Sequence, residues 1–132
     1  MQGTSRLVEL HDPTPADARD AARSLQNTAP AAAFDIDDVV LAVSEAVTNA
    51  LMHGVRPVWM RLWAARERII AAISDRGSGP PDPFAGLLPT QGSDSAGLSL
   101  WMAHQVCDHI TYATSQDGFT ITLQFHPRGK GR

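Results

Sequence analysis

The hydrophobic period of the chain changes at Pro57, and this change restricts the fold more than any other feature. Before it, residues 36–53 carry apolar side chains at helical spacing, so one side of a long helix must be buried. After it, residues 58–64 alternate with period two, and the strand-like run 68–75 follows a short turn. A long helix followed by a hairpin predicts a helix packed against a sheet.

The other predicted elements extend this unit. Thr14 and Pro15 are typical of a helix N-cap and first helical position, and Asp17 stands where a capping box needs it. Asp117-Gly118 predicts the turn of a closing hairpin. In chain order we expect strand 5–11, helix 14–26, helix 35–53, strands 58–64 and 68–75, helix 97–106, and strands 109–115 and 119–125. This order predicts an α/β fold of the two-layer sandwich type.

Two segments are predicted to lack regular structure. Residues 76–96 are rich in glycine and proline, and so long an irregular segment inside a small domain is more often a functional lid than an accident. Residues 127–132 are expected to form a flexible tail. We expect the whole chain, 1–132, to form a single domain, because 132 residues suit one hydrophobic core.

Composition excludes several classes of protein. The net charge of −3 and the absence of a long basic run argue against direct nucleic-acid binding, which depends on many phosphate contacts. Cys107 is the single cysteine, and no apolar run reaches membrane length, so we expect a cytoplasmic protein that contacts no membrane. The five histidines show no metal-ligand spacing, and Cys107 is expected to be a small buried side chain.

A polar stripe interrupts the predicted helix 35–53. Glu45 and Asn49 are four residues apart, opposite the apolar side, and His53 follows one turn later. An amide oxygen is a suitable ligand for Mg²⁺, and a neighbouring carboxylate can accept a hydroxyl proton. These residues therefore suit phosphoryl transfer, although the same spacing is common on the exposed face of an amphipathic helix.

A second polar group follows the strand 68–75. Asp75 ends this strand, and a buried carboxylate there needs a hydrogen-bond donor. The exocyclic amine of adenine would provide one, while Gly77 and Gly79 would let the backbone approach the flat base. The alternative is an ordinary turn at the end of a strand.

A third feature is the start of the predicted helix 97–106. Gly97 and Leu98 stand at its first residues, where free amides and the positive end of the helix dipole could receive phosphates. The alternative is that they only begin the helix and pack in the core.

Trp59, Arg61 and Trp63 share one face of a predicted strand. Tryptophan and arginine are enriched at protein interfaces. We nevertheless expect this face to be covered by core or helix packing, which is the commoner arrangement.

Three motifs in this order resemble those of the GHKL ATPases, and in particular the actinobacterial anti-sigma serine/threonine kinases. SEAVTNALMHG at 44–54 resembles the N box, ISDRGSG at 73–79 the first glycine box, and SAGLSLWMAHQVCDHI at 95–110 the second. The second box departs from the pattern, because Ser99 stands where a glycine is common.

The resemblance implies a fold, a chemistry and partners. It implies a mixed, mostly antiparallel sheet covered by helices on one face. It implies that the chain binds ATP and Mg²⁺, with Glu45 as catalytic base, Asn49 as metal ligand, and Asp75 bound to adenine. The other residues implied to bind the cofactor are His53, Gly77, Gly79, Gly97 and Leu98. The implied partners are a sigma factor, an anti-anti-sigma protein of the STAS type, and a second copy in a homodimer.

The sequence leaves three functions open. A protein kinase that also binds a sigma factor is favoured by the presence of both Glu45 and Asn49. A binding module without phosphoryl transfer is favoured by Ser99 in the second glycine box. The catalytic domain of a histidine kinase is disfavoured, because the chain has no room for a helical dimerisation domain with a phosphoacceptor histidine.

Overall fold

The computed structural model describes residues 6–27, 34–77 and 102–127. Its elements are β1 (Arg6–His11), α1 (Pro15–Ser24), the short 3₁₀ turn η1 (Leu25–Asn27), α2 (Ile36–His53), β2 (Trp59–Ala64), β3 (Ile69–Asp75), β4 (His109–Ser115) and β5 (Gly118–Phe125), with residues 102–106 also helical. The predicted strands and the first two helices are confirmed. The predicted lid and the first part of the predicted third helix lie outside the described residues.

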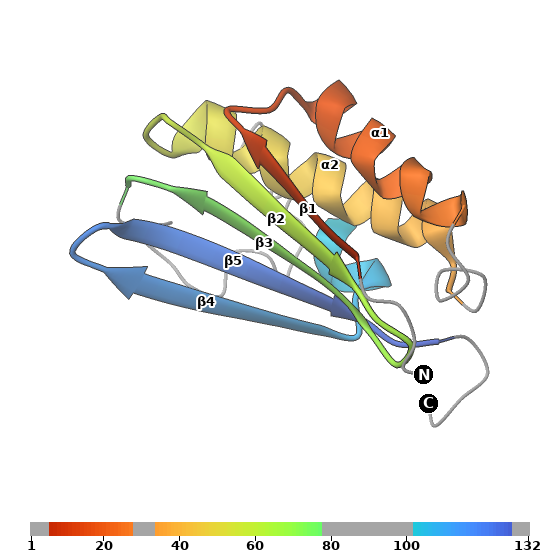
Figure 1. The fold of residues 1–132 in the computed structure, drawn as a ribbon. Helices are drawn as coiled ribbons and strands as arrows, with labels where there is room; N and C mark the ends of the chain where they lie inside the picture. Colours follow the sequence, from red (N-terminus) through yellow and green to blue (C-terminus); the bar gives the residue numbers. More distant parts are fainter. Residues whose placement is uncertain (1–5, 28–33, 78–101, 128–132) are drawn as a thin grey trace.

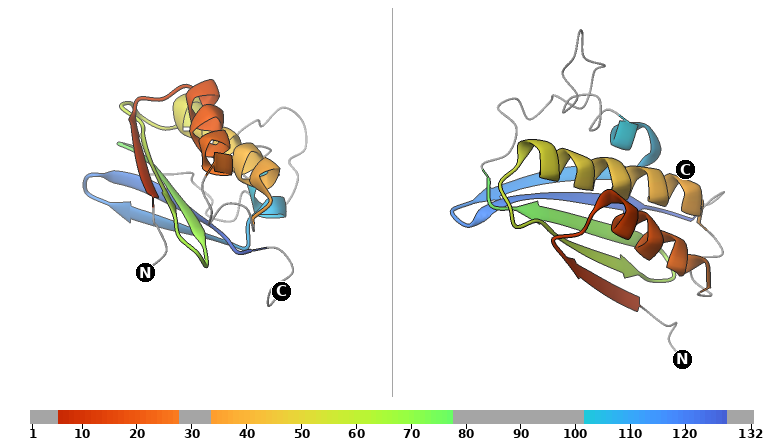
Figure 2. Two further views of the ribbon diagram at one scale, coloured as in Figure 1. Left: turned by 45° about the vertical axis from the view of Figure 1, so that its right-hand side comes forward. Right: turned by 90° about the horizontal axis from the view of Figure 1, so that it is seen from above.

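The strands form one sheet in the order β1-β2-β3-β5-β4, and every pairing among the described strands is antiparallel. Helices α1 and α2 and the helical residues 102–106 all lie on the same face of this sheet (Figure 1, Figure 2). The predicted two-layer α/β sandwich, with helices on one face of a mostly antiparallel sheet, is therefore confirmed. None of the helices that the structure describes is both long and apolar enough to cross a membrane.

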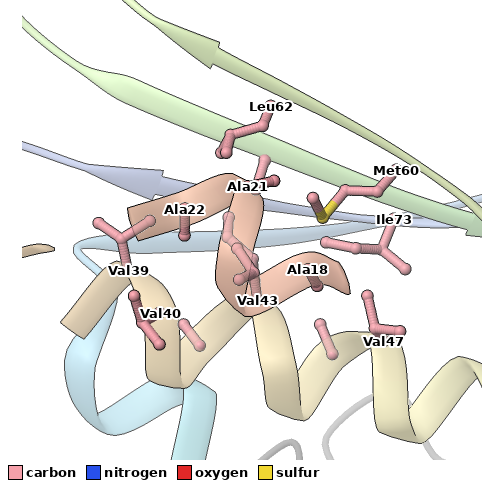
Figure 3. Close-up of a cluster of buried hydrophobic side chains, with 14 of the residues drawn as sticks. Ala18, Ala21, Ala22, Val39, Val40, Val43, Val47, Met60, Leu62 and Ile73 are labelled. Atoms are coloured by element: carbon pink, nitrogen blue, oxygen red, sulfur yellow. The ribbon is translucent and has the colours of Figure 1, made fainter. Parts of the chain in front are cut away.

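The core fills the space between the helices and the sheet. Small side chains of α1, including Ala18 and Ala22, bring it close to α2, and Val43 of α2 points toward the sheet (Figure 3). Met60 and Leu62 of β2 meet them from the sheet and are fully buried. This side of α2 is the apolar side predicted from the sequence. The apolar face of the helix and the apolar face of the strands therefore pack against each other in one core.

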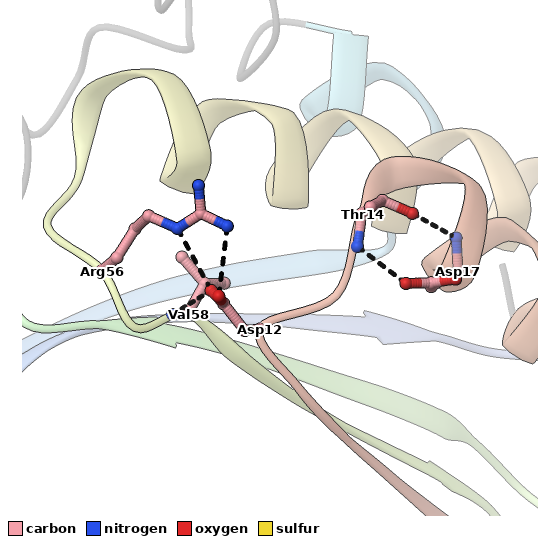
Figure 4. Close-up of polar contacts among 5 residues, drawn as sticks. All are labelled: Asp12, Thr14, Asp17, Arg56 and Val58. Carbon is pink, nitrogen blue, oxygen red and sulfur yellow. Dashed lines mark hydrogen bonds and ion pairs between the residues drawn. The ribbon is translucent and has the colours of Figure 1, made fainter.

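Helix α1 begins with the predicted capping box. The Thr14 hydroxyl accepts from the backbone N–H of Asp17 at 3.0 Å, and the Asp17 carboxylate accepts from the backbone N–H of Thr14, also at 3.0 Å (Figure 4). Each bond satisfies a backbone donor that the first helical turn leaves without a partner. The start of α1 is therefore set by its own sequence.

Asp12 ties the β1–α1 corner to the loop that follows α2. Its carboxylate accepts two hydrogen bonds from the Arg56 guanidinium, at 3.1 and 3.3 Å, and one from the backbone N–H of Val58 at 3.3 Å (Figure 4). These contacts hold the pKa of Asp12 below its usual value. Asp12 also has a positive φ of 51°, a conformation that aspartate and asparagine tolerate better than most residues.

We expect Asp12→Asn to lower the melting temperature at neutral pH and to weaken its acid dependence. A carboxyl group with a depressed folded-state pKa stabilises the fold above its unfolded pKa, and this contribution disappears as the pH falls through the folded value. Melting followed by circular dichroism from about pH 7 to about pH 3 measures both effects. Asparagine keeps the backbone preference, so equal melting curves for the two proteins would show that the Asp12 contacts contribute nothing.

The helical residues 102–106 contact the rest of the fold through buried Ala103 and through a hydrogen bond to the sheet. His104 Nε2 lies 2.7 Å from the hydroxyl of Tyr112 on β4, and the Tyr112 ring stacks on Phe119 of β5. Burial lowers the pKa of His104. Burial, together with the carboxylates of Asp108 and Asp38, raises the pKa of the Cys107 thiol to about 12, so Cys107 is an unreactive packing residue.

The prediction for Trp59, Arg61 and Trp63 is wrong. Their face of β2 is the one that the described helices do not cover (Figure 2), and 44% of the Trp63 surface is exposed. Arg61 is exposed as well, and Trp59 is half-buried. All the described helices lie on the other face of the sheet, so no helix in the described part of the chain packs over these side chains.

Candidate functional site

The two elements that carry the predicted site residues, α2 and β3, end next to each other at one end of the sheet. Strand β3 ends at Asp75 and α2 ends at His53, and both ends lie on the same side of the molecule (Figure 1). The backbone N–H of Arg76 donates to the carbonyl of Val55 at 2.8 Å and joins the two chain segments. The helix that carries Glu45 and Asn49 is thus fixed to the strand that ends in Asp75.

Asp75 is a buried carboxylate, with only 4% of its surface exposed. Its Oδ1 accepts from the backbone N–H of Gly77 at 2.6 Å and from that of Val55 at 3.3 Å. No donor among the described residues reaches its second oxygen, Oδ2. One oxygen therefore holds the carboxylate in place, and the described part of the chain leaves the other to accept from an incoming donor.

Two glycines lie against this carboxylate and a third lies against the backbone carbonyl of Asp75, and none has room for a side chain. A Cβ on Gly54 would lie 2.5 Å from both Cγ and Oδ2 of Asp75, and a Cβ on Gly77 would lie 2.8 Å from Oδ1. A Cβ on Gly118, whose φ is +150°, would collide with the Asp75 carbonyl oxygen. The missing side chains let the backbone pack closely around Asp75, and Gly54 in particular lies directly against its carboxylate.

We expect Gly54→Ala to lower ATP affinity at least tenfold and to destabilise the fold by about 1–3 kcal/mol, the usual cost of overpacking. The new methyl group must displace the Asp75 carboxylate or the Ala50 carbonyl oxygen, which would lie only 2.7 Å from it. Calorimetry with ATP and thermal melting measure the two effects. Met52→Ala is the matched control, because Met52 is 60% exposed on the same turn of α2. Wild-type affinity in Gly54→Ala would contradict the role given to this contact.

Asn49 is buried, with 7% of its surface exposed, and its side-chain oxygen has no hydrogen-bond partner in the described part of the chain. Such an orphaned acceptor is costly unless something binds it. A neutral oxygen of this kind fits the ligand preference of Mg²⁺. The burial of Asn49 shows that this residue does not belong to an exposed helix face, whereas Glu45 is half-buried and His53 is exposed.

Glu45 precedes Asn49 by one helical turn, about 6 Å along the axis. Its side chain is half-buried and makes no hydrogen bond or ion pair with any described residue. A carboxylate without a partner is available to accept a proton. Neighbouring Ser44 differs, because its hydroxyl accepts from Arg19 of α1 at 3.1 Å and so joins the two helices.

The remaining predicted site residues divide into two groups. His53 is exposed at the end of α2, one turn beyond Asn49, and Gly77 contacts Asp75 as described. Gly79, Gly97 and Leu98 lie outside the described residues. The described residues therefore include the predicted metal-ligand and adenine-binding residues but not those of the predicted phosphate position.

Sequence reasoning missed three contributors to the site. The sequence indicates only a helix stop at Gly54 and a turn residue at Gly118, although both contact Asp75. The sequence gives no indication of the role of Val55, because this residue contacts Asp75 through its backbone N–H and not through its side chain. A conformational clue exists for Gly118, since it follows a turn-forming aspartate, but the closeness of Gly54 to Asp75 depends on the packing of α2 against β3.

Comparison with known proteins agrees with this arrangement. The sequence profile of a family described as the histidine kinase-like ATPase domain matches residues 11–125. The chain belongs to this family. Membership in the histidine kinase-like ATPase family implies ATP binding. No curated protein gives a significant match to the sequence.

Two solved structures share the fold of this histidine kinase-like ATPase domain. One contains the RsbU and RsbW domains of Rv1364c from Mycobacterium tuberculosis, with 21% identity and a TM-score of 0.59. The match covers 94% of this chain but 32% of that one. The other is the histidine kinase domain of the E. coli osmosensor EnvZ, with 18% identity and a TM-score of 0.52, covering 100% of this chain and 95% of that one. At these identities the matches show the fold alone.

Proposed function

We propose that this chain is an anti-sigma factor serine/threonine kinase, which binds ATP with Mg²⁺, phosphorylates an anti-anti-sigma protein of the STAS type and binds a sigma factor. The observation that carries the proposal is the pairing of two incomplete polar groups, the open Oδ2 of Asp75 and the orphaned oxygen of Asn49. Glu45, one helical turn before Asn49, supplies a carboxylate that has no partner among the described residues. The similarity to a structure that contains an RsbW domain supports the protein-signalling context.

Adenine recognition would depend on Asp75. Its Oδ2 would accept the exocyclic amine of the base, while the amides of Gly77 and Val55 keep the carboxylate from rotating. A buried acceptor left without its donor is costly, so a purine that lacks the amine would bind much more weakly. Preference for adenine thus follows from the burial of Asp75.

Phosphoryl transfer would depend on α2. Asn49 would hold Mg²⁺ through its side-chain oxygen, and the bound ion would offset the charge of the phosphate oxygens. Glu45 would accept the proton of the serine or threonine hydroxyl as that oxygen forms its bond to the γ-phosphorus and the bond to the β-phosphate oxygen breaks. The products are a phosphorylated partner and ADP.

Labelled ATP tests this function directly. The protein is incubated with Mg²⁺, γ-labelled ATP and a purified STAS-type protein from the same genome, and the acid stability of the label on each chain is measured. Acid-stable label on the STAS-type protein supports the proposal. Acid-labile label would identify histidine phosphorylation, and tight ATP binding without any transfer to the STAS-type proteins tested would identify a binding module. Either result would overturn the serine/threonine assignment.

A further inference from the structure

The face of the sheet that the described helices leave uncovered carries an apolar patch at one end. The patch consists of Leu7, Trp63, Ile70 and Ala72, which lie on three adjacent strands. In the strand register Leu7 pairs with Trp63, and Trp63 pairs with Ile70, so these three side chains form one row across β1, β2 and β3. Leu7 is 55% exposed and Trp63 is 44% exposed. A contiguous exposed apolar patch of this kind is typical of a binding surface.

Trp63 lines two shallow hollows in the surface. One hollow, of about 300 Å³, is lined by Leu7, Arg61, Trp63, Ile70 and Ala72. The other, of about 360 Å³, is lined by Trp63, Ala65, Arg66, Glu67 and Arg68 at the β2–β3 turn. Each hollow has room for an apolar side chain, and the tryptophan that lines both resembles the aromatic anchors found at the centres of protein interfaces.

The rim of the patch is basic, although the chain as a whole has a net charge of −3. The two hollows are lined by three arginines and one glutamate. Arg61 is paired with Glu9 at 3.2 Å, but Arg66 and Arg68 make no ion pair with any residue that the structure describes. Two exposed guanidinium groups beside an apolar row are complementary to a segment that carries both carboxylates and an apolar side chain.

The rest of this face differs from the patch. Along the same row, β5 and β4 present Gln124 and His109, and the next row presents Thr122 and Thr111. Within these two rows the apolar side chains are therefore confined to β1, β2 and β3. The patch also lies at the β2–β3 turn, at the opposite end of β3 from Asp75 and on the opposite face from the helices (Figure 1, Figure 2).

We infer that this patch is a docking surface for an acidic segment of a partner protein, which places an apolar side chain beside Trp63 and carboxylates against Arg66 and Arg68. The inference depends on the open face of the sheet and not on the proposed kinase activity. Because the patch is remote from Asp75, a partner bound there leaves the nucleotide site accessible.

Titration of the isotope-labelled protein with defined peptides tests the inference by NMR. The probe is an eleven-residue peptide with a central pair of leucines flanked by glutamates. Two comparison peptides replace the glutamates by lysines or the leucines by serines. We expect the acidic apolar peptide to shift the Trp63 indole N–H and the amides of Leu7 and Ile70, and the comparison peptides to bind at least tenfold more weakly.

Three variants locate the contact. Arg66→Glu combined with Arg68→Glu lies in an exposed turn, and we expect it to weaken peptide binding at least tenfold without changing the fold. Trp63→Ser is expected to have a similar effect. Thr111→Ala, on the same face but outside the patch, should leave the affinity unchanged.

Several results would overturn the inference. One is that millimolar acidic peptide causes no shifts in the patch, and another is that the lysine peptide binds equally well. A third is that peptide binding is unchanged in both Arg66→Glu/Arg68→Glu and Trp63→Ser. A fourth could come from sedimentation of the free protein. A dimer that dissociates on Trp63→Ser would show that a second copy of the chain covers this face instead.

Discussion

Replacing Asp75 by asparagine is expected to lower the affinity for ATP by roughly 100-fold while the fold remains intact, because a buried donor would then face the donor on the base. The asparagine oxygen can still accept from the backbone N–H groups of Gly77 and Val55, which bond Oδ1 in the wild type. Its amide nitrogen then takes the place of Oδ2. The steric change is small, so the loss of affinity reports the hydrogen bond itself.

Inosine triphosphate tests the hydrogen bond to the base more directly. Its six-position carries a carbonyl in place of the amine, so the wild-type protein should prefer ATP, and Asp75→Asn should lose that preference. Calorimetry with both nucleotides measures the two affinities. Asp20→Asn, the same substitution at an exposed position on α1, serves as control. If Asp75→Asn still bound ATP as the wild type does, Asp75 would not be the adenine ligand.

Glu45→Gln is expected to lower the rate of phosphoryl transfer by roughly 10²–10⁴-fold, the usual contribution of a general base. ATP affinity should change little, because the substitution preserves shape and the Asn49 side chain stays in place. Single-turnover transfer of label, measured beside ATP binding, separates the two quantities. Asp37→Asn, an exposed position on the same helix, is the matched control. An equal loss in rate and in ATP affinity would assign Glu45 to binding and not to proton transfer.

Much of the fold could be predicted from sequence because its signals are local. The capping residues Thr14 and Asp17 predict the start of α1, and the alternation of apolar and polar side chains predicts the strands. The open face of the sheet could not be predicted this way. Trp63 alternates with buried Leu62 and Ala64, and period two shows that the two faces differ without showing whether a helix covers the second one.

The site shows the same division between local and tertiary information. Spacing was enough to place Glu45 and Asn49 on one side of a helix, since helical geometry alone brings residues four apart together. It could not show that Gly54 lies against Asp75, far along the chain, because that contact arises only when α2 packs across the end of β3. Backbone donors such as the Val55 N–H leave no trace in a side-chain pattern.

The loop between α2 and β2 is anchored at both of its ends. Val55 is bonded to Asp75 and Arg76, and Arg56 and Val58 are bonded to Asp12. Folding therefore already restricts the conformations of this loop, and little further chain entropy remains to be lost there when a purine arrives. On this side of the nucleotide site, association should accordingly be fast and should need no slow rearrangement of the backbone.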